Sequence, residues 1–172
     1  MSELCDVYDV NGNKTGEVFI RGEALREGQY QLAANMWIIN SKLQILIQKR
    51  SKGKKSFPNI WATHGGSVGI GENSLNASIR EAYEEIGIVI QAENIKYLTR
   101  NISPNLISDN YIVIQEFDIT SAILQSEEVS EIKWASLEEI EHMIKNKTFF
   151  EYPELPYVVD FINNNRYQVV KN

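Results

Sequence analysis

Residues 66–88 of this 172-residue chain constrain its fold more than any other stretch, because they join a glycine-rich loop to a strongly two-sided helix. At about 100° per residue, residues 74–86 would place their charged side chains on one helical face and their apolar side chains on the other. We therefore expect a helix from about Ser74 to Ile86. Its charged face would hold Arg80, Glu81, Glu84 and Glu85, and its packing face would hold Leu75, Ile79, Ala82, Tyr83 and Ile86.

The three glutamates of the charged face need a compensating cation. Like charges three or four residues apart destabilise a helix, and Arg80 supplies only one opposite charge. A divalent metal would supply the rest. Hard oxygen ligands favour Mg²⁺, with Mn²⁺ as a substitute, and Mg²⁺ commonly binds a few carboxylates together with substrate phosphates. The ordinary alternative for such a charge run is a solvated helix face.

The loop before this helix favours the interpretation as a metal and phosphate site. Four of the seven residues from 65 to 71 are glycine, which lets the main chain turn sharply and approach a ligand closely. Either Asn73 or Ser74 can cap the helix that follows. A glycine loop that leads into a carboxylate-lined helix is much less generic than either part alone.

The same stretch resembles the signature of the Nudix hydrolase family. That signature reads Gly-x5-Glu-x7-Arg-Glu-(apolar)-x-Glu-Glu-x-Gly-(apolar). Upstream, a strand ending in Gln-Lys-Arg (residues 48–50), a basic loop and the pattern Phe-Pro-x-x-Trp (residues 57–61) resemble a subgroup related to isopentenyl diphosphate isomerase. The chain matches the fixed positions at Gly66, Glu72, Arg80, Glu81, Glu84, Glu85 and Gly87, with Ala82 and Ile88 at the apolar positions.

This resemblance implies Mg²⁺-dependent hydrolysis of a diphosphate bond in a nucleoside diphosphate linked to another group. Glu81 would position or deprotonate the attacking water, and Arg80 would orient Glu81 through a charge-assisted hydrogen bond. Glu84 would share in catalysis, and Glu72 would support the loop or the outer shell of the metal. The implied metal ligands are Glu81, Glu84, Glu85 and the main-chain carbonyl of Gly65.

Some site residues would lie outside the signature segment, residues 66–88. A further glutamate beyond it serves as base or ligand in relatives; of Glu127, Glu128 and Glu131 we take Glu128 as the candidate. Among the basic residues before the segment, Arg50 is the first candidate for binding phosphate, because a guanidinium grips phosphate oxygens bidentately. Lys49 is the second. A solvated loop is the alternative for this basic group.

His64 has two open interpretations. It either contacts substrate or metal, or it is a loop histidine bonded to the backbone. The other histidine, His142, is expected on the surface of a helix.

The rest of the chain predicts an α/β fold of Nudix type, an α/β/α sandwich with a mixed sheet, in a single domain over residues 1–172. Residues 1–30 would form an appended β-hairpin that turns at Asn11-Gly12, and residues 21–31 either a short helix or a loop. Residues 163–172 would be a flexible tail. Strands are expected at 31–40, 43–50, 60–63, 95–102, 111–119 and 131–135, and helices at 137–145 and from about 155 to 162.

Composition narrows the class of protein further. Apolar residues make up 43% of the chain and charged residues 23%, as in ordinary globular proteins. The net charge of −6 disfavours a nucleic-acid surface and suits a small-molecule substrate. The single cysteine, Cys5, allows no internal disulfide, and no apolar run reaches the length of a membrane span. We expect a cytoplasmic protein that binds neither nucleic acid nor membrane; a homodimer is left open.

Two other functions are weighed against hydrolysis. Isopentenyl diphosphate isomerase has a similar fold, but it uses a cysteine near this loop and a histidine-rich metal site. Residues 61–65 contain no cysteine, and the chain has only two histidines, so the sequence disfavours the isomerase. A non-catalytic Nudix module that senses a nucleotide is disfavoured because binding alone would not require the whole set of carboxylates.

Overall fold

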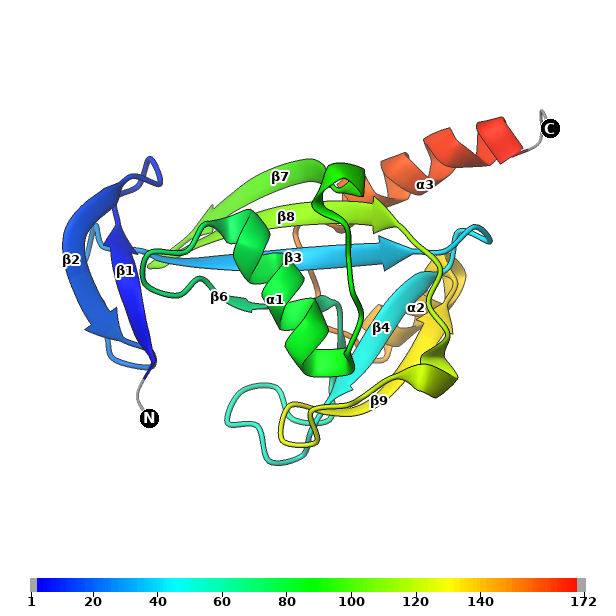
Figure 1. Ribbon diagram of the computed structural model, residues 1–172, viewed down its shortest axis with the longest axis horizontal. Coiled ribbons are helices and arrows are strands. Elements are labelled where there is room, and N and C mark those ends of the chain that lie inside the picture. The colour runs from blue at the N-terminus through cyan, green and yellow to red at the C-terminus, as the bar shows by residue number, and fades with distance from the viewer. Residues whose placement is uncertain (1–2, 170–172) are drawn as a thin grey trace.

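The apolar run at residues 31–39 forms strand β3 (Gln31–Ile39), the centre of a seven-stranded sheet in the computed structural model, which describes residues 3–169 (Figure 1). β3 runs parallel to β8 and antiparallel to β4 and β6, so the sheet is mixed as expected. The strand order is β5-β4-β3-β8-β7, with β6 also paired to β3 and β9 to β4. The other strands are β4 (Ile45–Arg50), β5 (Trp61–Ala62), β6 (His64–Ser67), β7 (Lys96–Ser103), β8 (Leu106–Ile114) and β9 (Val129–Ala135).

Helices cover both faces of this sheet and create two cores. Because successive side chains of a strand point to opposite faces, Met36 and Ile38 pack toward helix α1 (Ser74–Ile86), whereas Trp37 and Ile39 join the opposite core. That second core is closed by α2 (Leu137–Lys145) and α3 (Leu155–Val169). The result is the α/β/α sandwich that the sequence predicts, with α1 in front of the sheet in Figure 1.

Helix α1 has the predicted bounds because its two ends are capped locally. The Asn73 side chain accepts a hydrogen bond from the main-chain N–H of Asn76 at 2.8 Å, which identifies Asn73 as the N-cap. Gly87 ends the helix in the left-handed conformation, with φ of 78°, and its N–H bonds to the carbonyl of Tyr83. Glycine adopts this conformation without a Cβ penalty.

The predicted faces of α1 are wrong at two positions. Tyr83 is 58% exposed, although we expected it to pack, and Glu85 is only 4% exposed, although we placed it on the charged face. The helix lies against the sheet through small side chains at Ala77, Ser78 and Ala82, which let it approach closely. This contact turns Glu85 inward and leaves Tyr83 at the edge.

The N-terminal residues form the predicted hairpin of β1 (Leu4–Tyr8) and β2 (Lys14–Ile20), at one end of the molecule (Figure 1). The Asp9 carboxylate accepts hydrogen bonds from the N–H groups of Asn11 and Asn13, both at 2.9 Å, and fixes the turn. Reciprocal main-chain bonds between Tyr8 and Tyr30, of 2.8 and 2.9 Å, join the hairpin to the start of β3. Residues 21–30 form a connecting loop without a helix.

Two other predicted boundaries are corrected. Strand β8 begins at Leu106, five residues before the predicted start at residue 111, so Asp109 lies within a strand and not in a loop. The buried polar side chains of β8 are hydrogen-bonded: Asp109 pairs with Arg100, and Asn110 pairs with Asn35. Such pairing allows polar residues within a buried strand.

The last helix is also longer than predicted. α3 continues to Val169, through most of the range in which we expected a tail, and residues 170–172 lie outside the described part of the chain. No helix within residues 3–169 is both long enough and apolar enough to cross a membrane.

The burial of α1 predicts a contrast between two of its residues. Ile86→Ala should lower the free energy of unfolding by about 2–5 kcal/mol, because Ile86 is fully buried against the sheet. Tyr83→Ala should cost about 0.5 kcal/mol or less, since this side chain is mostly exposed. Urea denaturation of both variants measures the difference, and equal losses would contradict this orientation of the helix.

Candidate functional site

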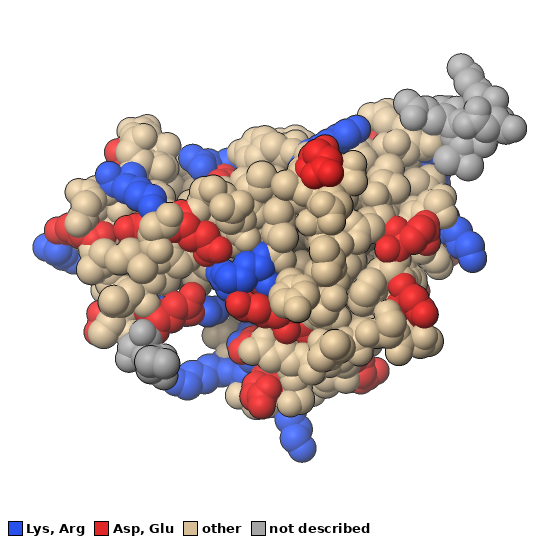
Figure 2. All heavy atoms as spheres, viewed as in Figure 1, with Lys and Arg blue, Asp and Glu red and all other residues tan. Residues whose placement is uncertain are grey.

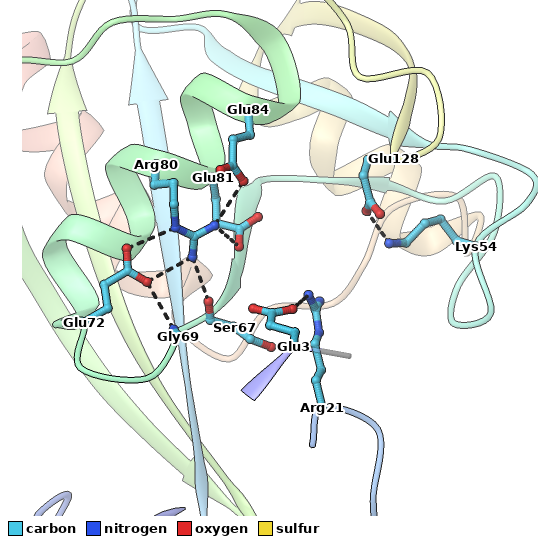
Figure 3. A network of polar contacts seen from close by, with 10 residues as sticks. All are labelled: Glu3, Arg21, Lys54, Ser67, Gly69, Glu72, Arg80, Glu81, Glu84 and Glu128. Carbon is cyan, nitrogen blue, oxygen red and sulfur yellow. Dashed lines mark hydrogen bonds and ion pairs between the residues drawn. The ribbon is translucent and has the colours of Figure 1, made fainter. Parts of the chain in front are cut away.

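The Arg80 guanidinium is the centre of a polar network that joins α1 to the glycine loop (Figure 3). Its Nε and Nη2 atoms donate to the two carboxylate oxygens of Glu72, each at 3.0 Å. Its Nη1 donates to Glu81 at 2.9 Å and to Glu84 at 3.0 Å. Nη2 also donates to the main-chain carbonyl of Ser67 at 3.1 Å. One arginine thus holds three of the signature carboxylates and the end of β6.

Glu72 links this network to the backbone of the loop. Its carboxylate also accepts the N–H of Gly69 at 3.1 Å. Burial works in the opposite direction, but the hydrogen bonds from Arg80 and Gly69 lower the pKa of Glu72. The same pairing raises the pKa of Arg80. Glu72 therefore supports the loop, one of the two roles that its position in the signature implies.

The Glu81 carboxylate lies against the backbone of β6 at Gly66, because glycine has no side chain to occupy that space. A Cβ atom at Gly66 would stand 2.4 Å from the Glu81 carboxylate, so even alanine would displace that group. Burial and the neighbouring charge of Glu85 raise the pKa of Glu81 to about 7, although Arg80 opposes the shift. A carboxyl group with a pKa near neutrality is suited to accept a proton from water at physiological pH.

Glu85 and His64 face each other in the interior of the protein. His64 Nδ1 lies 3.4 Å from Glu85 Oε2, and both side chains are almost fully buried. Neither ring nitrogen of His64 nor Oε2 of Glu85 has a hydrogen-bond partner among the described residues, and the same is true of Gln48 Oε1. His64 thus contacts a residue that the signature assigns to metal, and its ring is not bonded to the backbone. Unpaired buried polar atoms are costly and commonly mark a functional site.

The residues present fit a hard divalent cation. They offer carboxylate oxygens from Glu81, Glu84 and Glu85, and the buried Oε2 of Glu85 lacks a partner among the described residues. No three acidic, histidine or cysteine side chains in the part of the chain that the structure describes form a metal cage. Arg80 bonds to both Glu81 and Glu84. An incomplete cage suits Mg²⁺, which usually binds one or two carboxylates together with waters and substrate phosphates.

A cavity of about 590 Å³ opens beside Gly65 and Gly66. Three aromatic rings line it: Phe57 and Phe150 make an edge contact with ring centroids 4.9 Å apart, and the Phe150 and Tyr152 rings are tilted with centroids 4.7 Å apart. Its polar lining residues include Arg50 and Arg100 together with Asn35, Asn101 and Glu154. A volume of this size accommodates a small organic ligand.

The structure separates the two basic residues at the end of β4. Arg50 lines the cavity, where its guanidinium donates twice to the carbonyl of Ser56, at 3.2 and 3.0 Å. Lys49 does not line this cavity; its Nζ pairs with Glu131 at 2.7 Å and lies near the Trp61 ring. Neighbouring residues of a strand point to opposite faces, so the sequence prediction that grouped Lys49 with Arg50 is not supported by their positions.

Glu128 differs from the other two glutamates that we considered in its partner. It forms an ion pair with Lys54 of the basic loop, and Figure 3 shows this pair across from Glu81. Glu131 is held by Lys49 at the outer side of β4, and Glu127 is exposed. This arrangement leaves Glu128 as the candidate for an additional base or ligand.

The sequence did not predict that residues 150–154 and Arg21 approach the site, although Tyr152 is one of the aromatic residues that the sequence offers for stacking on a base. Residues 150–154, which form one wall of the cavity, reach it because Trp61 and Phe149 form a β-bridge, a long-range pairing without a local signal. Glu154 is almost fully buried there, with hydrogen bonds from Asn101 at 2.9 Å and from Asn35 and Trp37 at 3.4 Å. Burial raises its pKa. Arg21, which the sequence also did not indicate, directly follows strand β2 of the hairpin.

Comparison with protein families matches residues 29–157 to the NUDIX domain. The match includes the signature segment, the whole of β3 to α2 and the wall of the cavity. The chain therefore belongs to the Nudix family, and the resemblance inferred from residues 66–88 is confirmed.

Relatives and solved structures agree with this assignment. The chain is 33% identical over 151 residues to an uncharacterized Nudix hydrolase of Listeria monocytogenes, covering 87% of this chain and 89% of the relative. It is 31% identical over 119 residues to isopentenyl-diphosphate Δ-isomerase of Escherichia coli, covering 66% and 65%.

Among crystal structures, DR0079 from Deinococcus radiodurans matches with a TM-score of 0.75 at 22% identity, covering 92% of this chain and 98% of that one. The NUDIX domain of Shewanella oneidensis NrtR, solved with ADP ribose, matches with a TM-score of 0.57 at 17% identity, covering 81% and 88%. These two show a common fold. Family and relatives together identify a Nudix hydrolase.

The environment of Glu81 predicts how the stability of the metal-free protein depends on pH. The folded protein holds this proton more tightly than the unfolded chain, whose glutamates titrate near 4.5. The free energy of unfolding should therefore fall as pH rises from about 4.5 to about 7, by up to about 3 kcal/mol from this group. Glu81→Gln should flatten that slope.

Urea titrations in chelator at several pH values measure this effect. Glu138→Gln, a change at a more exposed glutamate of α2, serves as the control and should keep the wild-type slope. A Glu81→Gln slope equal to that of wild type would show that Glu81 titrates normally in the folded protein.

Proposed function

We propose that this Nudix hydrolase cleaves the diphosphate bond of a nucleoside diphosphate linked to another group, with Mg²⁺ as its metal and Mn²⁺ as a substitute. One observation carries the proposal. A ligand-sized cavity with an arginine and an aromatic wall opens at Gly65 and Gly66, directly beside the partly buried carboxylate of Glu81. A diphosphate at this junction would have its nucleoside in the cavity and its phosphates at the carboxylates.

The signature residues have distinct roles in this proposal. Glu84, Glu85, Glu81 and the carbonyl of Gly65 would hold the metal, which neutralises phosphate charge and lowers the pKa of bound water. Arg80 orients Glu81 through its 2.9 Å hydrogen bond. Glu81, held in place by Arg80, would receive the proton of the attacking water or fix that water in place.

The cavity suits a nucleoside better than an inorganic or purely aliphatic group. The cavity is lined by the aromatic rings of Phe57, Phe150 and Tyr152. Aromatic side chains can stack on any of the nucleic-acid bases. Asn101 and Glu154 also line the cavity and offer amide and carboxylate atoms for a base or a ribose. The solved complex of the NrtR NUDIX domain with ADP ribose is a precedent for a nucleoside diphosphate ligand on this fold.

The metal assignment predicts that Glu85→Gln lowers turnover without lowering stability. Loss of one ligand charge should reduce kcat about 100-fold or more, because metal stabilisation of the transition state is worth several kcal/mol. In chelator the variant should melt at or above the wild-type temperature, because it loses the repulsion between Glu85 and Glu81. Melting curves with and without Mg²⁺ should show that most of the Mg²⁺-induced stabilisation is gone.

The substrate for this measurement comes from a panel of nucleotide sugars, dinucleotides, dinucleoside polyphosphates, coenzyme A and damaged nucleoside triphosphates. Hydrolysis that persists in chelator, or Glu85→Gln turnover equal to wild type, would refute the metal site. If Glu85→Gln instead melts well below wild type in chelator, Glu85 is a structural partner of His64 rather than a ligand.

The different positions of Arg50 and Lys49 predict different kinetic effects. Arg50→Ala should raise KM about tenfold or more, the value of one hydrogen bond to a charged group, because Arg50 lines the cavity. Lys49→Ala, a change of similar size and charge at the adjacent position, should leave KM within about threefold. Steady-state kinetics on the best panel substrate measures KM for both variants. Equal changes in KM would mean that the cavity is not the substrate site.

Isomerisation of isopentenyl diphosphate is the second candidate, favoured by the 31% identity to the Escherichia coli isomerase. The structure argues against it, because Cys5 is buried in the small core of the hairpin with Val7 and Phe19. No cysteine lines the cavity. Isopentenyl diphosphate therefore belongs in the panel, and formation of dimethylallyl diphosphate at an enzymatic rate would replace the hydrolase proposal.

A further inference from the structure

The N-terminal hairpin is attached directly to the signature segment. The carbonyl of Leu4 accepts a hydrogen bond from the N–H of Ile70 at 3.1 Å. The Asp6 carboxylate accepts the N–H of Gly71 at 2.9 Å and also pairs with Lys14 at 2.6 Å. The position of the hairpin is therefore fixed relative to the glycine loop, and residues at its base can reach the site.

Arg21, the first residue after β2, is at that base. Its N–H donates to the carbonyl of Glu3 at 2.8 Å, and its Nη1 pairs with the Glu3 carboxylate at 2.7 Å. Figure 3 shows the Arg21 guanidinium extending toward the space that Glu81 and the Lys54–Glu128 pair border. Figure 2 shows acidic and basic side chains gathered around a hollow between the hairpin and the body of the molecule.

Electrostatic coupling agrees with this placement. Partial burial opposes the shift, but the hydrogen bond to Glu3 and the charges of Glu81 and Glu128 raise the pKa of Arg21. Both carboxylates belong to the candidate catalytic site, so Arg21 is close enough to act on charges there.

Arg21 is also more readily available to a ligand than the other cations around these carboxylates. Arg80 already donates to three carboxylates and a carbonyl, and Lys54 is paired with Glu128. Among the described residues, Arg21 pairs with Glu3 alone, and the two side chains are 45% and 37% exposed. An ion pair this exposed contributes little to stability, so a phosphate can replace Glu3 at little cost.

We propose that Arg21 binds the diphosphate of the substrate, exchanging its Glu3 partner for phosphate oxygens, so that the hairpin completes the site. This inference rests on the proposed function. A guanidinium presents parallel N–H donors that match two phosphate oxygens, which a lysine ammonium does not. Arg21 lies before residue 29, where the match to the NUDIX domain begins, so it would be an addition to the family site from outside the matched domain.

The test uses the full-length chain and inorganic pyrophosphate with Mg²⁺, measured by titration calorimetry. Arg21→Ala should weaken pyrophosphate binding about tenfold or more, and Arg21→Lys should recover only part of that loss. Arg26→Ala is the matched control, because Arg26 belongs to the same segment but its exposed side chain pairs with Glu17. That control should bind as wild type does. Glu3→Gln should bind pyrophosphate as tightly as wild type or more tightly, because it releases Arg21.

Kinetics on the confirmed substrate adds an independent readout. Arg21→Ala should raise KM more than it lowers kcat, whereas a purely structural role would lower the melting temperature and affect Mg²⁺ binding as well. Wild-type pyrophosphate affinity in Arg21→Ala, or an equal loss in Arg26→Ala, overturns the inference and leaves the hydrolase proposal intact. If wild type neither binds pyrophosphate with Mg²⁺ nor hydrolyses any panel member, the proposed function fails and this inference with it.

Discussion

The hydrogen bonds of Arg80 are the interaction on which the site depends. The guanidinium joins the loop, through Glu72 and the carbonyl of Ser67, to the helix, through Glu81 and Glu84. It also supplies positive charge between Glu81 and Glu84, two carboxylates three residues apart on the helix that would otherwise repel each other. The same residue therefore shapes the loop, stabilises the charged face and orients the candidate base, three functions that a lysine with its single ammonium could not combine.

Sequence reasoning succeeded where the determinants are local. The bounds of α1 and α2 follow from apolar periodicity, and those of α1 also from a cap at Asn73 or Ser74, of which the structure has Asn73. The hairpin follows from its turn residues. The signature residues could be assigned because their spacing is fixed by one helix and one loop. The sandwich followed from the family resemblance, which the match to the NUDIX domain confirms.

The failures share a different cause, since each depends on contacts between distant segments. The inward turn of Glu85 results from the close packing of α1 on the sheet. The early start of β8 results from buried pairing of Asp109 with Arg100, which makes a polar stretch behave as a strand. The separation of Arg50 from Lys49, and the approach of Arg21 and residues 150–154 to the site, follow from which strands and loops become neighbours. No pattern within one segment carries that information.

The central position of β3 has a consequence for how the protein is made. Asn35 bonds to Asn110, 75 residues later, and to Glu154, 119 residues later, and parallel pairing of this kind folds slowly because a long loop must close first. During synthesis the glutamate helix emerges well before β8 and the cavity wall that complete its surroundings. A nascent chain would thus carry all the signature carboxylates while still lacking the cleft. Specificity toward a substrate is, in this sense, the last property that the growing chain acquires.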